Sequence, residues 1–238
     1  MGKKVEEIRK FWDDKAIEYG EDGRATLGES YLRLLEIKTM IKQIKYHKPR
    51  NVLDVGCGNG YSTKIYAKRF PSTQFIGMDY SEQMILNASK NQINNCTFIV
   101  GDVLNLNSFL EEKFDLILTQ RCLQNLVDYE SQYKAIKNLI NQKAPKGMLL
   151  LMECSKDGVE KLNKIRIRFG KKPIENIEPW HNTFFIDQKM INDFGAKIMH
   201  FSSTYMFLSK IIDLRLSFLG YILPAVGKFG YDKLYQIK

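Results

Sequence analysis

The chain has 238 residues with 44% apolar and 26% charged side chains, the composition of a globular protein with room for one α/β domain. It has no leader pattern and no apolar run of about 18 residues or more, so we expect neither a signal peptide nor a membrane-spanning segment. The net charge of +9 comes from basic residues spread over the whole sequence, and the four cysteines form no C-x-x-C pair. Both features argue against a nucleic-acid module, a zinc site or a disulfide framework, and they indicate a cytoplasmic protein without a metal.

The first 50 residues are expected to form a helical cap. Apolar residues recur at helical spacing over Val5–Glu18, and a second helix is predicted over Ser30–Tyr46, ending ahead of Pro49. A glycine-containing break separates the two helices. We assign residues 1–50 to this cap, 51–155 to a ligand-binding core and 156–238 to further elements of the same domain.

A predicted strand over Asn51–Val55 runs into a turn with three glycines, Gly56–Gly60, and then into a helix over Tyr61–Arg69. Glycine lets a ligand lie against the main chain, and the free amide groups of the helix then face that ligand. Asp79, nineteen residues after Gly60 and behind a second strand, is spaced to hold a ribose diol. The G-x-G-x-G spacing differs from the dinucleotide fingerprint, and no Gly-Lys-Ser/Thr follows as in a P-loop. The turn therefore predicts a nucleoside site of another kind.

Further strands are predicted near residues 74–78, 97–101, 114–119 and 147–153, and they alternate with helices. This alternation predicts a parallel sheet with right-handed crossovers. In a doubly wound fold of this kind, ligands bind at the carboxyl ends of the strands where the strand order reverses. We therefore expect an α/β fold with its site beside the glycine turn.

The segment Asp54–Gly60 (D-V-G-C-G-N-G) resembles motif I of the class I S-adenosylmethionine-dependent methyltransferases. Four later segments follow in the order of that family: 75–84, 98–103, 114–121 and 146–153. Several motifs in the right order are far more specific than one glycine turn, and together they span roughly residues 30–155. The resemblance implies a Rossmann-like fold with a seven-stranded, mostly parallel sheet, and S-adenosylmethionine as the cofactor.

By this resemblance, the turn would hold the methionine and ribose parts of the donor. The turn residues concerned are Gly56, Gly58, Asn59 and Gly60. Asp54 would order the turn and reach the donor's amino group through water, and the backbone carbonyl of Gln120 would meet the same group. Tyr19 resembles an N-terminal aromatic that closes over the donor, but it reads equally well as a helix-end aromatic in the core.

The resemblance also assigns the residues around the nucleoside. Asp79 would bind both ribose hydroxyls, and Tyr80 and Met84 would pack on the adenine. Asp102, with the backbone amide of Val103, would read the adenine edge.

The last third of the chain is less regular. Its predicted elements are two helices and two strands, over Val159–Phe169, Asp187–Phe194, Lys197–Ser203 and 230–237. Asp187 is expected to act as the N-cap of its helix. Between the two strands, residues 204–229 form an insertion rich in Leu, Ile, Phe and Tyr. An acceptor lid, a homodimer contact and an interfacial membrane helix are all open for this insertion, and its weak basic face favours a lid or self-association.

The acceptor side rests on polar residues at the expected ligand face. Arg121 and Asn125 follow the fourth strand as candidate substrate-binding residues. Glu153 ends the fifth strand, where it would either act as a base that positions the acceptor or cap a helix. His181 would act as a general base, or play the structural role that a lone histidine usually has.

Further candidate acceptor residues lie around His181. Trp180 and Asn182 flank it in the same loop. Arg166 and Arg168 precede that loop on a basic helix, and a guanidinium group there would suit a phosphate or carboxylate. Because the two arginines do not share a helix face, only one of them can point at the site.

The sequence as a whole predicts methyl transfer to a small-molecule acceptor. O-methylation of a sugar or phosphorylated sugar precursor is the leading prediction, because the W-H-N loop after a basic helix resembles bacterial methyltransferases of surface-polysaccharide and sugar-modifying pathways. Three alternatives stay open: N-methylation of an amino sugar, methylation of RNA or protein, and a donor-binding subunit without catalysis.

Overall fold

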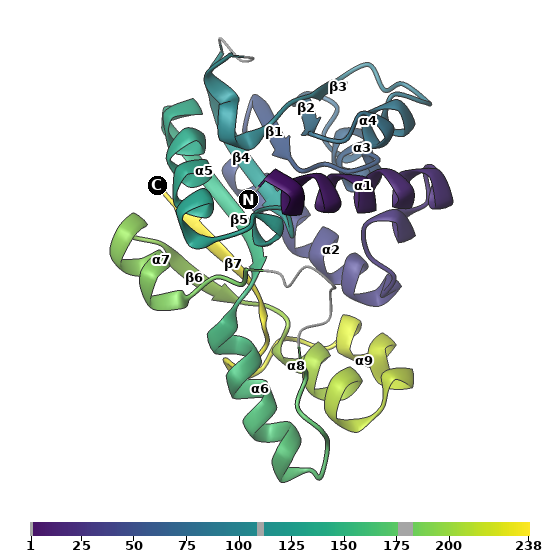
Figure 1. Ribbon diagram of the computed structural model, residues 1–238, viewed down its shortest axis with the longest axis vertical. Helices are drawn as coiled ribbons and strands as arrows, with labels where there is room; N and C mark the ends of the chain where they lie inside the picture. The colour runs from purple at the N-terminus through teal and green to yellow at the C-terminus, as the bar shows by residue number, and fades with distance from the viewer. Residues whose placement is uncertain (1, 109–111, 176–182) are drawn as a thin grey trace.

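The protein is described by a computed structural model that covers residues 2–108, 112–175 and 183–238 (Figure 1). Its centre is a seven-stranded sheet of order β3-β2-β1-β4-β5-β7-β6. The strands are β1 (Asn51–Val55), β2 (Gln74–Asp79), β3 (Cys96–Val100), β4 (Phe114–Gln120), β5 (Lys143–Cys154), β6 (Lys197–His200) and β7 (Asp232–Ile237). All neighbouring pairs are parallel except those of β7, which runs antiparallel to β5 and to β6. The predicted Rossmann-like, mostly parallel sheet is confirmed.

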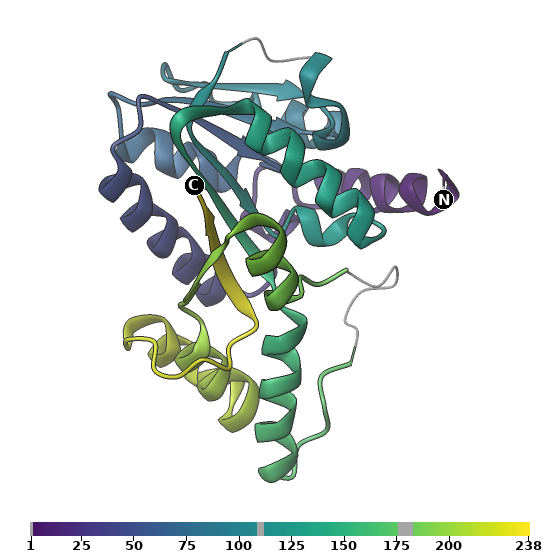
Figure 2. The same ribbon diagram turned by 90° about the vertical axis from the view of Figure 1, so that its left-hand side faces the viewer.

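Helices pack on both faces of this sheet (Figures 1 and 2). They are α1 (Gly2–Tyr19), α2 (Ser30–His47), α3 (Tyr61–Arg69), α4 (Glu82–Ala88), α5 (Tyr129–Gln142), α6 (Lys156–Arg168), α7 (Asp187–Phe194), α8 (Ser203–Met206) and α9 (Ser217–Ile222). Among the described residues, no helix is both long enough and apolar enough to cross a bilayer.

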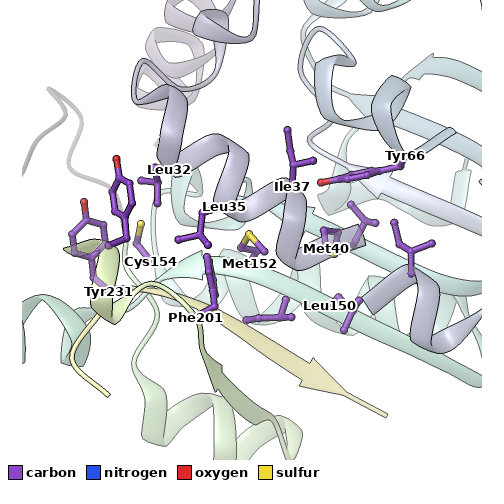
Figure 3. Packing of buried hydrophobic residues seen from close by; sticks show 14 of the residues in the cluster. Leu32, Leu35, Ile37, Met40, Tyr66, Leu150, Met152, Cys154, Phe201 and Tyr231 are labelled. Carbon is purple, nitrogen blue, oxygen red and sulfur yellow. The ribbon is translucent and has the colours of Figure 1, made fainter. Parts of the chain in front are cut away.

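The alternation of side chains along the central strands divides the core in two. Val52, Leu116 and Leu150 face one way and pack with α2 and α3. Their neighbours Leu53 and Ile117 face the other way and pack with α5 and α7. Both faces of a central parallel strand are covered, so these strands are apolar almost throughout. Figure 3 shows the first cluster, in which side chains of α2 lie over those of β5.

β1 lies at the point where the strand order reverses. Val55, its last residue, pairs with Met78 of β2 on one side and with Thr119 of β4 on the other. The chain therefore leaves β1 and β4 at the same edge of the sheet, on opposite sides of a crevice that the crossover helices leave open.

The insertion between β6 and β7 contains α8, a π-helical segment (Phe207–Ile212), a 3₁₀ turn and α9. Close approach of α9 to α8 requires a glycine, because a Cβ on Gly220 would lie 2.7 Å from the Cα of Tyr205. The insertion also contacts the start of α2. The hydroxyl of Tyr205 donates to Glu29 at 3.1 Å, and the ammonium of Lys210 lies 2.5 Å from the other oxygen of Glu29, the N-cap residue of α2.

Several predicted boundaries in the last third were wrong. β6 ends at His200, β7 begins at Asp232, and α6 begins at Lys156, behind Ser155 as its N-cap. Tertiary contacts decide these ends: the Ser155 hydroxyl accepts from the Gly158 amide and also holds a buried lysine of β7.

Asp187 is not the N-cap of α7; Ile186 occupies that position without a side-chain cap. The Asp187 carboxylate instead accepts from the hydroxyls of Ser155 and Tyr235, at 2.8 Å each, and pairs with the ammonium of Lys233 at 2.5 Å. Lys233 is fully buried, so its charge requires such a partner. That partnership joins residues far apart in the sequence, which local capping rules do not detect.

Candidate active site

A cavity of about 230 Å³ lies at the carboxyl ends of β1, β2 and β4. The turn after β1 forms its floor through Gly56, Cys57 and Gly58. α1, α2 and residues 26–28 provide the opposite wall. The cavity therefore sits where the reversal of strand order predicts a ligand.

The glycine turn brings bare main chain to the cavity. Gly56 and Gly58 have φ of +73° and +55°, a region that other residues rarely adopt. A Cβ on Gly56 would lie 2.4 Å from the sulfur of Cys122, and a Cβ on Gly58 would lie 2.6 Å from Thr26 Cγ2. Both positions therefore require glycine for conformation and for space.

Two buried carboxyl groups lie beside this turn and line the cavity. Asp79 accepts from the Gly58 amide at 2.9 Å and from the Ser81 amide at 3.0 Å, which fixes it between the turn and α4. Burial raises its pKa to about 6, although these hydrogen bonds oppose the rise. Asp54 accepts from the Thr63 hydroxyl at 2.6 Å, and burial raises its pKa to about 7.

Aromatic and apolar side chains line the cavity next to Asp79. Tyr80 and Met84 do so as the resemblance implies. The hydroxyl of Tyr80 is buried and has no hydrogen-bond partner among the described residues. Trp12 of α1 also lines the cavity; the sequence showed it only as one member of an apolar helix face.

Tyr19 is not among the residues that line the cavity, and its predicted place over the donor stays a prediction. It packs in a small cluster with Ala16, Ala25 and Met84. The Lys15 ammonium lies 5.0 Å and the Arg24 guanidinium 5.4 Å from the centroid of its ring.

Asn59 and Gly60 lie in the turn but not on the cavity surface. The Asn59 side-chain amide donates to the carbonyls of Gly20 at 2.7 Å and Asp22 at 2.8 Å, which fastens the segment after α1 to the turn. Gly60 is the N-cap of α3. These two residues therefore shape the site without facing it.

Asp102 and Val103 lie outside the cavity lining. The Asp102 carboxylate accepts from the Leu104 amide at 2.9 Å and from the Asn105 side chain at 3.0 Å. Their role at the adenine edge stays a prediction. Gln120 does line the cavity, and its side-chain carbonyl accepts from the Tyr66 hydroxyl at 2.6 Å.

The other half of the cavity contains three ionisable side chains: the buried Arg33 and Glu36 from α2, and the half-buried Arg121 after β4. Arg33 donates to the carbonyl of Leu27 at 2.5 Å, and Arg121 donates to that of Thr26 at 2.6 Å. The Arg121 Nε lies 3.8 Å from Glu36 Oε1. Burial raises the pKa of Glu36 to about 8, against the opposing charge of Arg121.

Arg121 and Asn125 both line the cavity, as the sequence predicts for acceptor residues. Arg121 adopts a positive φ of 52°, which turns the chain sharply at the end of β4. Asn125 donates its side-chain amide to the Arg121 carbonyl at 2.7 Å and so stabilises that turn.

Glu153 is buried but does not line the cavity. One carboxylate oxygen accepts from the Thr119 hydroxyl at 2.7 Å and from the amides of Cys122 and Leu123, and the other accepts from the Gln124 amide at 3.1 Å. These contacts cap the turn after β4. The structure therefore contradicts the prediction of Glu153 as a base and supports its alternative, a capping role.

Arg166 and Arg168 also lie outside the cavity. Arg166 donates to the backbone carbonyls of Lys172 and Lys210, and Arg168 is exposed at the end of α6. Both lie in the last turn of α6, which extends away from the sheet (Figure 2), so the structure does not bring them to the cavity with the other candidates. His181, Trp180 and Asn182 lie outside the described residues. Within those residues, no group of histidines, cysteines and carboxylates is arranged to hold a metal ion.

The fold and this site define a class of protein. A family model described as a methyltransferase domain matches residues 46–190, more than half of the chain. The chain therefore belongs to this methyltransferase family, and the predicted class I S-adenosylmethionine-dependent type is confirmed.

Particular relatives share part of its length. Trans-aconitate 2-methyltransferase of Yersinia pseudotuberculosis is 29% identical over 144 residues, which cover 60% of this chain and 51% of the relative. The enzyme of the same name from Acidovorax is 30% identical over 110 residues, covering 46% of this chain and 40% of that protein. The chain thus spans about half the length of the relatives that it matches.

Solved structures match over nearly the whole chain. A plantazolicin methyltransferase superposes with a TM-score of 0.60 at 14% identity, covering 98% of this chain and 96% of that one. The magnesium protoporphyrin IX methyltransferase of Synechocystis gives a TM-score of 0.58 at 17% identity, with 98% of each chain covered. At such low identity, this likeness shows the fold alone.

Proposed function

We propose that the protein transfers a methyl group from S-adenosylmethionine to an oxygen atom of a small anionic molecule. The observation that carries this proposal is the division of one cavity into two chemically different halves. One half has bare main chain, Asp79 and Tyr80; the other has Arg33, Glu36 and Arg121. A group-transfer enzyme needs two adjoining sites of this kind.

The residues present fit the donor. A ribose would meet the Asp79 carboxylate, and the unpartnered hydroxyl of Tyr80 offers a buried hydrogen-bonding group on the same wall. Met84 and Trp12 add apolar surface for a flat ring. When bound, this cofactor would supply a methyl group on a positively charged sulfur atom.

The chain's own part is to position the two reactants and exclude water. Arg33 and Arg121 hold the carbonyls of residues 26 and 27 over the cavity, and Asn59 holds the segment before them. The hydrogen bonds of Arg121 and Asn59 join the N-terminal cap to the core, and that of Arg33 orders the loop within the cap. Closure over the reactants therefore depends on side chains rather than on the sheet.

A phosphorylated sugar and a carboxylic acid would both be methyl acceptors that carry the proposed negative charge. The first follows the sequence prediction, although the loop that suggested a surface polysaccharide lies outside the described residues. The second is the kind of compound named in the trans-aconitate 2-methyltransferases. The cytoplasmic location and the homodimer stay predictions from the sequence.

Two measurements test the proposal. Calorimetry with S-adenosylmethionine and S-adenosylhomocysteine should show binding of each at one site. Transfer of a labelled methyl group should then occur to members of a panel of carboxylic acids and sugar phosphates, in preference to neutral sugars, amino sugars, RNA and protein. Transfer to RNA or protein alone would overturn the small-molecule proposal, and donor binding without any transfer would favour a donor-binding subunit.

A further inference from the structure

Two buried polar atoms in the acceptor half of the cavity have no hydrogen-bond partner among the described residues. They are Nε of Arg33 and Oε1 of Glu36, on side chains that are 8% and 3% exposed. An unsatisfied buried polar group costs free energy, and a buried charge costs more. Both residues line the cavity.

The arginines have capacity beyond their structural contacts. Each guanidinium carries several N–H donors, and each is described with one hydrogen bond to a backbone carbonyl, Arg33 to Leu27 and Arg121 to Thr26. The 3.8 Å between Arg121 Nε and Glu36 Oε1 is too long for a hydrogen bond. Holding the loop therefore does not account for both groups.

The guanidinium of Arg33 also packs against Tyr61 and Gly23. It lies 5.1 Å from the ring centroid of Tyr61, and a Cβ on Gly23 would lie 2.8 Å from both its Cζ and its Nε. A fixed guanidinium loses little freedom when it binds an oxyanion, and its planar donors match carboxylate or phosphate geometry.

We propose that Arg33 and Arg121 bind a carboxylate or phosphate group of the methyl acceptor, and that the side chain of Glu36 contacts a polar group beside it. This inference rests on the proposed function, because it names the substrate class of the same cavity. The binding residues come from α2 and from the turn after β4, so the acceptor would lie between the N-terminal cap and the sheet.

The arrangement also sets the charge that the site selects. Burial raises the pKa of Glu36 to about 8, so its carboxyl group is largely uncharged at neutral pH. The two arginines then face the acceptor without a full opposing charge from α2. A neutral Glu36 can donate one hydrogen bond to the anion or to a neighbouring oxygen.

The test uses the full chain saturated with S-adenosylhomocysteine, into which citrate, glucose 6-phosphate and glucose are titrated separately by calorimetry. Citrate and the sugar phosphate distinguish the two sources of the oxyanion, and glucose is the uncharged control. We expect at least one anion to bind and glucose to bind far more weakly. Arg33→Met and Arg121→Met should each weaken the anion at least about tenfold more than they weaken S-adenosylhomocysteine, for which only the contact to residues 26 and 27 is lost.

Two further variants separate binding from folding. Gly23→Ala keeps both charges but displaces the Arg33 guanidinium, the flexible end of its side chain, so it should fold normally and bind the anion several-fold more weakly. Arg168→Met removes an exposed arginine away from the cavity and should change nothing.

The inference is overturned if neither anion binds the saturated wild type, or if anion affinity survives in both arginine variants. It is also overturned if these variants lose S-adenosylhomocysteine and the anion to the same extent, since that pattern indicates a structural role. Failure of the wild type to bind S-adenosylhomocysteine at all would instead count against the proposed function.

Discussion

The two halves of the cavity are built in different ways. The donor half comes mainly from one short strand-turn-helix unit and the end of the next strand, with Trp12 of α1 added, and its key contact joins Asp79 to the Gly58 amide. The acceptor half combines α2 with the turn after β4. Arg121 and Glu36, which are far apart in the sequence, lie 3.8 Å from each other there. Local sequence therefore determines the first half, whereas the second exists only after the chain has folded.

Removal of the Asp79 carboxylate should cause the largest loss of donor affinity among these variants. Asp79→Ala leaves the Gly58 and Ser81 amides without their acceptor and removes the proposed ribose contact. We expect S-adenosylhomocysteine affinity to fall about 100-fold or more by calorimetry. Asp115→Ala, which breaks the ion pair with Arg50 at the opposite end of β4, is the matched control and should leave it unchanged. Equal effects of the two substitutions would show that Asp79 acts only through stability.

The cost of a steric clash at the glycine turn can be measured separately from the cost of its left-handed backbone conformation. Gly56→Ala combines a φ of +73° with a clash against Cys122, whereas Gly195→Ala has a φ of +62° with open space around it. We expect Gly195→Ala to cost about 1 kcal/mol of unfolding free energy and Gly56→Ala about 2 to 4 kcal/mol, measured by denaturant unfolding. Equal costs would mean that the turn relaxes away from Cys122.

The hydrogen bonds that join the N-terminal cap to the glycine turn should affect binding less than the groups of either half of the cavity do. Asn59→Ala removes the hydrogen bonds to the carbonyls of Gly20 and Asp22. We expect faster amide hydrogen exchange over residues 19–27 and a loss of donor affinity of about tenfold, because the cap then closes less often. Unchanged exchange in this segment would show that other contacts hold the cap.

The smallest expected effect is the pH dependence of the acceptor half. The pKa of Glu36 is raised to about 8 by burial; Arg121 lowers it, and Asp232, Glu153 and Glu29 raise it further. As the pH rises through this pKa, the carboxyl group of Glu36 loses its proton and becomes negative. Anion affinity should therefore fall several-fold between pH 7 and pH 9, which lie about one pH unit below and above the pKa. Glu36→Gln should remove that fall in calorimetric titrations while donor affinity stays constant. A fall that persists in Glu36→Gln would assign it to another group.

The same pKa also predicts the sign of a stability change. A carboxyl group whose pKa is higher in the folded state than in the unfolded state favours folding at low pH, and this contribution is lost as the pH rises from about 4.5 to about 8. Relative to wild type, Glu36→Gln should therefore be more stable at pH 9 than at pH 5, which chemical denaturation at the two pH values checks. The reverse order would contradict the raised pKa.

The sequence predicted the elements of the donor half better than the residues of the acceptor half. The bounds of β1 and α3 were right to the residue, because an apolar run, a glycine turn and a helix follow one another directly. Trp12, Arg33 and Glu36 were missed, because on an amphipathic helix they look like any core aromatic or surface charge. Nothing in the local pattern shows that α2 buries these two charged residues and leaves Lys42 and Lys45 exposed.

Glu153 and Asp187 failed for a related reason. Each was assigned from its position at the end of a predicted element, yet each is held by groups that only the fold brings near: the amides after β4 for Glu153, and Lys233 of β7 for Asp187. Spacing along the chain tells where a carboxylate sits, but its partners decide whether it faces a ligand or the interior.

The contact between the insertion and Glu29 has a consequence for how this protein can diversify. Glu29 is the N-cap residue of α2, the helix that carries Arg33 and Glu36. Its carboxylate accepts hydrogen bonds from Tyr205 and Lys210 of the insertion. A lengthened or rebuilt insertion would tilt that helix at its first turn and thereby re-aim both side chains, with the glycine turn untouched. New acceptor preferences could thus arise from changes in a segment that does not line the cavity.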